Sequence, residues 1–134
     1  MPSSLLLRAT TALLILTYVG SAASQPRPSG TTRTDLQRAD LSAPGREVLQ
    51  ARVDFAPRSS FPRHRHPGEE IIYVIEGTIE YELPGKGWVT FNKGDVLFVP
   101  ARGVHAARNR SGKPAAELAT YVLEKGKPLT EFVD

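Results

Sequence analysis

The chain has 134 residues, a formal net charge of +3 at pH 7 and no cysteine. This length suits one domain, and so small a charge excludes a polyelectrolyte built to bind nucleic acid. The absence of cysteine excludes disulfides, thiolate metal ligands and a cysteine nucleophile. Stability must therefore come from the apolar core, from a bound metal or from association of subunits.

The first 24 residues have the pattern of an export signal. Arg8 supplies the positive charge, an apolar stretch runs over 9–19, and small residues follow over 20–23. The alternative is a membrane anchor, but the apolar stretch is short for a bilayer and no basic cluster follows it. We therefore expect residues 1–24 to be a cleaved signal peptide. The mature protein is then periplasmic or secreted and has no stable membrane anchor.

Residues 25–45 carry few apolar side chains. The first part is rich in proline, serine and threonine, and the second holds Leu36 and Leu41 between charged residues. Neither part has a clear period, so we expect a linker followed by an irregular strap across the domain. The polar residues 124–134 are expected to form a C-terminal tail or edge.

The segment 46–123 has the pattern of short strands. Apolar and polar residues alternate over 49–55 and again over 78–83. The strand expected over 70–76 differs because it contains five consecutive apolar residues, which is typical of a strand buried on both faces. Turn residues separate these runs at regular intervals, and the last strand is expected over 115–123. Together these features favour an all-β sandwich or barrel.

The segment 61–77, FPRHRHPGEEIIYVIEG, is the most informative part of the chain. His64 and His66 project from one face of an extended strand, and Glu70 opens an apolar run where a carboxylate has no packing role. His105 follows a later turn. A surface pair is the ordinary explanation of an isolated His-x-His, but buried imidazoles without partners would be costly. Three imidazoles and a carboxylate suit a divalent transition metal.

These residues resemble two motifs of the cupin family. The first motif, His-x-His-x3-Glu-x6-Gly, fits a set made of His64, His66, Glu70 and Gly77. The second, Gly-x5-Pro-x-Gly-x2-His-x3-Asn, fits Gly94, Pro100, His105 and Asn109. Two positions depart from the family pattern, because Arg58 and Arg102 stand where glycines are expected.

The resemblance is to small bacterial cupins and covers roughly residues 45–123. It implies a double-stranded β-helix, or jelly roll, over 46–123. It also implies one divalent transition metal, which could be Zn, Cu, Fe, Mn or Ni, with four ligands: His64, His66, Glu70 and His105.

Neighbouring residues are candidates for further roles. Spacing and strand parity select Glu70 over Glu69 as the ligand, and Glu70 is also the candidate catalytic group that shuttles a proton. Asn109 either supports a ligand from behind or caps the next turn. Arg102 either holds an anionic substrate or belongs to a solvated rim. The candidates for a second acid or base are Tyr81 and Tyr121.

Two functions follow from this ligand set. One is a metal-dependent enzyme with oxygenase-like or isomerase-like chemistry on a small organic molecule. The other is a non-catalytic module in which the metal anchors a small ligand. We also expect a homodimer, because the outward residues of the 70–76 strand, Ile71, Tyr73 and Ile75, need cover.

Overall fold

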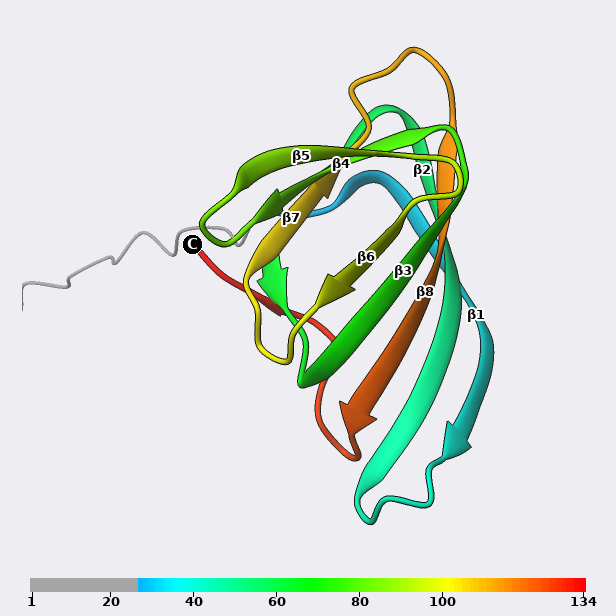
Figure 1. Cartoon of the computed structure of the whole chain (residues 1–134), viewed down its shortest axis with the longest axis vertical. Coiled ribbons are helices and arrows are strands. Elements are labelled where there is room, and N and C mark those ends of the chain that lie inside the picture. Colours follow the sequence, from blue (N-terminus) through cyan, green and yellow to red (C-terminus); the bar gives the residue numbers. More distant parts are fainter. Residues whose placement is uncertain (1–26) are drawn as a thin grey trace, which may run out of the picture.

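The computed structural model describes residues 27–134, where every regular element is a β-strand (Figure 1). The strands are β1 (Ser29–Asp40), β2 (Arg46–Arg65), β3 (Gly68–Glu76), β4 (Thr78–Leu83), β5 (Gly87–Asn92), β6 (Val96–Val99), β7 (His105–Arg108), β8 (Ala115–Glu124) and β9 (Glu131–Phe132). Within residues 27–134, no helix has the length and apolar character needed to cross a bilayer. The expected signal peptide, residues 1–24, lies outside the described residues.

The strands form one antiparallel sheet built around β2. Their order is β5-β4-β7-β2-β8-β3-β6, and both β1 and β9 also pair with β2. Residues 46–55 of β2 lie between β1 and β8, whereas residues 60–65 pair with β7 and β9. Because β2 changes partners along its length, the sheet curls around its interior, with β4, β5 and β7 on one side and β3, β6 and β8 on the other (Figure 1). The predicted all-β double-stranded β-helix is confirmed.

The interior of the barrel follows the two-residue period of the sequence. Leu49, Ala51, Val53 and Phe55 on β2 are at most 7% exposed. Ile79 and Tyr81 on β4 are buried in the same way, as are Ile72 and Val74 on β3. Successive side chains of a strand point to opposite faces, so this alternation places one face of each strand in a common core.

The outer face of β3 differs from the expectation. Ile72 and Val74 face the core, but Ile71 and Tyr73 are 46% and 47% exposed. The register places Ile71 beside Phe98 and Tyr73 beside Val96 on β6, and both of these β6 residues are also exposed. The prediction that β3 is buried on both faces is therefore wrong for a single chain, because no described segment covers this apolar surface.

Strand β1 corrects the predicted linker and strap. Residues 29–40 form a long antiparallel pairing with β2, from Ser29 opposite Ser60 to Asp40 opposite Glu47. Nearly all of its side chains are exposed, so the strand carries no apolar period that the sequence could reveal. It is held by backbone hydrogen bonds and by surface pairs such as Arg38 with Glu47, 2.7 Å apart.

The predicted C-terminal tail also contributes to the barrel. In β9, Phe132 lies opposite His64 and Glu131 lies opposite Arg65. Arg65 donates two hydrogen bonds to the Glu131 carboxylate, at 3.0 and 2.5 Å. The tail therefore lies against the end of β2 that carries the candidate ligands.

At Gly68, the first residue of β3, the backbone packs closely against that of β8. A Cβ atom on Gly68 would lie 1.8 Å from the carbonyl oxygen of Val122. We expect Gly68→Ala to lower the free energy of unfolding by more than about 2 kcal/mol, since the two strands must separate. Gly112→Ala is the control, because a Cβ there meets nothing within 4 Å, and its effect should stay within about 0.5 kcal/mol. Equal chemical denaturation curves for the two variants would contradict this packing.

Candidate metal centre

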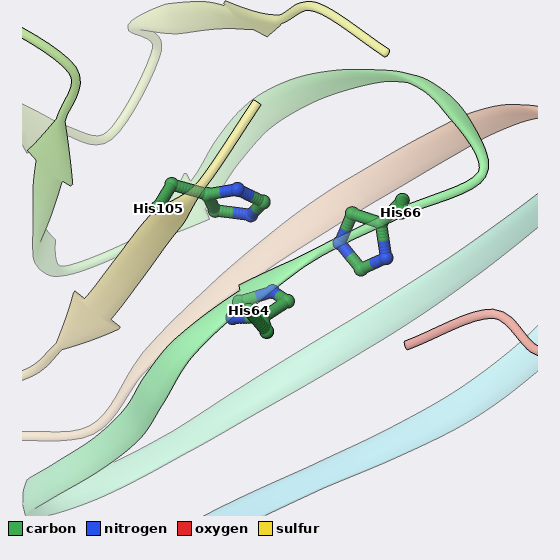
Figure 2. A group of neighbouring side chains, drawn as sticks. All are labelled: His64, His66 and His105. Carbon is green, nitrogen blue, oxygen red and sulfur yellow. The ribbon is translucent and has the colours of Figure 1, made fainter. Parts of the chain in front are cut away.

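Three histidines converge inside the barrel from two neighbouring strands. His64 lies near the end of β2, His66 follows that strand, and His105 begins β7 in register with His64. Figure 2 shows the three rings turned toward a common space. One nitrogen from each ring lies within 4.8 Å of the others, and all three residues are buried. The strand pairing thus brings together ligands that are 41 residues apart in sequence.

Backbone carbonyls fix the orientation of each ring. The Nδ1 atoms of His64, His66 and His105 lie 2.7, 2.6 and 2.9 Å from the carbonyl oxygens of Pro62, Leu129 and Gly103, respectively. A carbonyl oxygen can only accept a hydrogen bond, so each Nδ1 carries a proton. In the neutral ring Nε2 then holds a free lone pair, which is the tautomer needed for metal coordination.

Glu70 completes the cluster from β3. Its Oε2 atom lies 3.3 Å from Nε2 of His66 and 3.1 Å from Nε2 of His105. With both rings neutral these atoms are all acceptors, and Oε2 of Glu70 and Nε2 of His66 are buried without a hydrogen-bond partner. Ligands bound at right angles to a metal with bonds of about 2.1 Å lie about 3 Å apart. The spacing and the unpartnered acceptors therefore fit a cation between these atoms.

The charges of the cluster support the same interpretation. Burial, reinforced by the neighbouring His105 and His66, lowers the pKa of His64 to about 3. Burial acts to raise the pKa of Glu70, but the neighbouring imidazoles of His105 and His66 outweigh it and the net pKa is lowered. For His66, burial is outweighed by Glu70 and the pKa is raised. Glu70 therefore stays an anion beside the imidazole rings.

The histidines line a cavity of about 220 Å³. Its apolar wall includes Val53, Phe55 and Phe61, and Arg33 and Thr31 of β1 also line it. Arg33 forms an exposed ion pair with Asp35. The space suits a small organic molecule beside the cluster, with one cationic side chain near it.

A second buried carboxylate, Glu117 on β8, lines the same cavity. The hydroxyl of Tyr81 donates a 2.5 Å hydrogen bond to its Oε2 atom. Burial, followed by the charge of Glu70, raises the pKa of Glu117 to about 8. Sequence analysis missed this residue. The feature that could have identified it is its position on β8, where Glu117 shares the inward face of the strand with the buried residues Ala115 and Ala119.

The other candidates from the sequence lie around the cluster. Tyr81 and Tyr121 are buried in the cavity wall, and the Tyr121 ring packs edge-on against His66 with centroids 4.9 Å apart. Glu69 has the opposite parity to Glu70 and is only partly buried. These positions agree with selecting Glu70 over Glu69.

Asn109 is buried away from the histidine cluster, in the turn after β7. Its amide nitrogen donates to the carbonyl oxygens of Ala56 and Lys113, at 3.2 and 2.8 Å. Its side-chain oxygen accepts from the backbone nitrogen of Ser111 at 2.9 Å. These contacts favour the turn-capping role over support of a metal ligand.

Arg102 lies outside the histidine cavity and lines an adjoining groove with Arg65 and Lys127. Its φ angle is 60°, so this arginine adopts the left-handed conformation at a position where the cupin motif has glycine. Its backbone nitrogen donates to the carbonyl oxygen of His66 at 3.1 Å. The residue thus connects the loop before His105 to the end of β2.

Comparison with known proteins agrees with this fold. A family model described as "Cupin domain" matches residues 51–121. Germin-like protein 1-1 of Oryza sativa subsp. japonica is 35% identical over 106 residues, which cover 73% of this chain and 47% of that protein. The chain thus spans about half the length of the curated relatives it matches.

Solved structures show the same barrel. The polyketide cyclase RemF from Streptomyces resistomycificus has a TM-score of 0.64 and 25% identity, covering 82% of this chain and 77% of that one. An oxalate oxidase structure has a TM-score of 0.62 and 24% identity, covering 89% and 63%. The family match spans more than half of the chain and includes the three histidines and Glu70. This chain belongs to the cupin domain family.

Proposed function

We propose that the protein binds one divalent transition metal through His64, His66, His105 and Glu70. In this proposal the metal serves oxygenase-like or isomerase-like chemistry on a small organic molecule in the cavity. The observation that carries it is the set of three Nδ1–carbonyl hydrogen bonds, which leaves a lone pair on each Nε2. The Glu70 carboxylate lies beside two of these atoms, those of His66 and His105. A bound divalent ion would polarise an oxygen atom of the substrate as a Lewis acid.

The protein's own residues supply the rest of the site in this proposal. The apolar wall formed by Val53, Phe55 and Phe61 excludes water from one side of the substrate. Arg33 attracts an anionic group toward the cavity. Similarity to structures named as a polyketide cyclase and an oxalate oxidase supports an enzyme.

The contacts of His66 favour a second function, that of a metal-anchored binding module. Its Nδ1 is bound to the carbonyl of Leu129 in the C-terminal segment, while its Nε2 faces Glu70 of β3. A metal at this point would join β2, β3, β7 and the C-terminal segment in a chain that lacks cysteine. Oxygen uptake and product formation with a panel of small acids and phenols would separate an enzyme from this module.

The metal site can be tested by competitive chelator titration of Zn²⁺. We expect His64→Ala, His105→Ala and Glu70→Ala each to lower the affinity at least about tenfold, or about 1.4 kcal/mol, because each removes a ligand. Glu69→Ala is the matched control and should leave the affinity unchanged. Loss of binding in Glu69→Ala with retention in Glu70→Ala would overturn the ligand set.

We propose that the protein is exported, on the basis of the pattern in residues 1–24. A chain that crosses the membrane unfolded acquires its metal afterwards, so the affinity order favours Zn²⁺ or Cu²⁺ over Mn²⁺. Intact-mass measurement and metal analysis of protein from its native source should find a chain starting near Ser24 or Gln25, with zinc or copper. Retention of Met1, or manganese in the site, would contradict these two expectations respectively.

We also propose that a second copy of the chain covers the exposed apolar face of β3 and β6. Two adjacent rows, Ile71 with Phe98 and Tyr73 with Val96, form a continuous surface that can meet its own copy about a twofold axis.

Sedimentation at micromolar concentration tests this interface. The wild type should be a dimer, and Phe98→Asp should be a monomer because a charge would be buried between the subunits. Leu36→Asp is the control, since Leu36 is exposed on β1, which is separated from β3 by β2 and β8. The Leu36→Asp variant should remain dimeric. A monomeric wild type would refute the proposal.

A further inference from the structure

Glu117 is an ionisable group in the cavity that the proposed metal site does not use. It lies on β8, four residues before Tyr121, and Tyr121 is the residue paired with Glu70 on β3. Four residues of strand span about 13 Å, so the backbone of Glu117 is well separated from that of Glu70. Both side chains nevertheless line one cavity with the three histidines. A molecule in this cavity lies between a metal and a second carboxyl group.

The contact with Tyr81 distinguishes the two oxygens of Glu117. Oε2 accepts the hydrogen bond from the Tyr81 hydroxyl. Among the described residues no hydrogen bond to Oε1 is present, and Glu117 contributes to the cavity wall. When the carboxyl group is protonated, Oε2 acts as the acceptor and the proton resides on Oε1. The acidic hydrogen is therefore the part of Glu117 available to a bound molecule.

The surroundings of Glu117 keep it protonated near neutral pH. Its pKa is raised to about 8 by burial and by the charge of Glu70. A group with a pKa near the working pH can both give and take a proton, which suits general acid–base catalysis. The charged or titratable side chains that line the same cavity are those of Arg33, Glu70, Tyr81, Tyr121 and the three histidines.

A purely structural role for Glu117 does not require a glutamate. Glutamine has nearly the same size and offers Tyr81 the same acceptor oxygen, without the cost of burying an ionisable group. An acid in this position adds one property to the cavity, which is an exchangeable proton.

We propose that Glu117, positioned by Tyr81, exchanges a proton with the molecule held at the metal. The ligands of the cavity are then small hydroxy, keto or hydroxamic acid compounds that coordinate through oxygen and gain or lose a proton on binding or reaction. In the forward step the Oε1–H bond breaks, its electron pair stays on the carboxylate, and the proton forms a bond to the ligand. The reverse step returns it, and no oxidant is needed. This inference rests on the proposed metal site and favours isomerase-like chemistry there.

Acetohydroxamic acid is a suitable probe, because it is small and binds metals as an anion after losing a proton. Its binding to the Zn²⁺-loaded protein is measured by titration calorimetry in two buffers of different ionisation enthalpy, from about pH 6 to about pH 9. The comparison of buffers gives the number of protons released per ligand bound. The variants are Glu117→Gln and, as a control on the same strand, Glu124→Gln.

We expect the wild type and Glu124→Gln to release fewer protons than Glu117→Gln, by up to one per site. The difference should grow toward the upper end of the pH range, where free Glu117 is ionised and takes up the proton that the ligand loses. Equal proton numbers in all three proteins would overturn the inference. Absence of Zn²⁺-dependent binding in the wild type would instead overturn the proposed metal site.

Infrared spectroscopy gives a second measurement that needs no variant. With ¹³C-labelled glutamate, addition of acetohydroxamic acid to the wild type at about pH 9 should produce the band of a protonated carboxyl group. Binding without such a band would refute proton transfer to Glu117, even if Glu117→Gln did not fold.

Discussion

Three backbone carbonyls determine what the histidine cluster can do. By accepting a hydrogen bond from Nδ1, each carbonyl fixes both the tautomer and the direction of one ring. Two of these carbonyls, at Pro62 and Gly103, lie two residues before the histidines that they orient. The third, at Leu129, comes from the far end of the chain. The site thus depends on the folding of the C-terminal segment onto β2, which keeps His66 in place.

Strand β2 links the oriented histidines to the packed core of the barrel. Its first part contributes Leu49, Ala51, Val53 and Phe55 to the core, and its last part carries His64. The apolar core therefore anchors one end of the strand, and pairing with β7 and β9 holds the other. A ligand on such a support loses little freedom on binding a metal, which is how a rigid scaffold contributes to affinity.

The sequence predicted the parts of the fold and site that local patterns encode. His64, His66 and Glu70 lie in one short segment, and the inward rows of β2 and β4 follow from alternation. Strand β1 was missed because a strand exposed on both faces has no apolar period. The role of the tail was missed because the contact between Leu129 and His66 spans 63 residues. Glu117 was missed although, like Glu70, it is an acid among the inward-facing side chains of a strand. Only the folded barrel shows that these side chains of β3 and β8 face one cavity.

The loop before His105 shows that a change in motif need not change a site. The left-handed backbone of Arg102 costs about 1–2 kcal/mol relative to the right-handed one, a penalty that glycine avoids. The hydrogen bond from its backbone nitrogen to the His66 carbonyl and the pairing of His105 with His64 hold the loop in place. The arginine therefore keeps the backbone path that the family glycine favours, and His105 still reaches the cluster.

The two buried carboxylates differ in charge because their partners differ. Glu70 faces imidazole nitrogens, which favour the anion and lower its pKa. Glu117 faces a tyrosine hydroxyl in an apolar wall and feels the negative charge of Glu70, so its pKa is raised. Environments that separate the pKa values of two carboxylates assign them different tasks. Glu70 is left as an anion that can hold a metal, and Glu117 as an acid that can move a proton. The charge of Glu70 helps to keep Glu117 protonated.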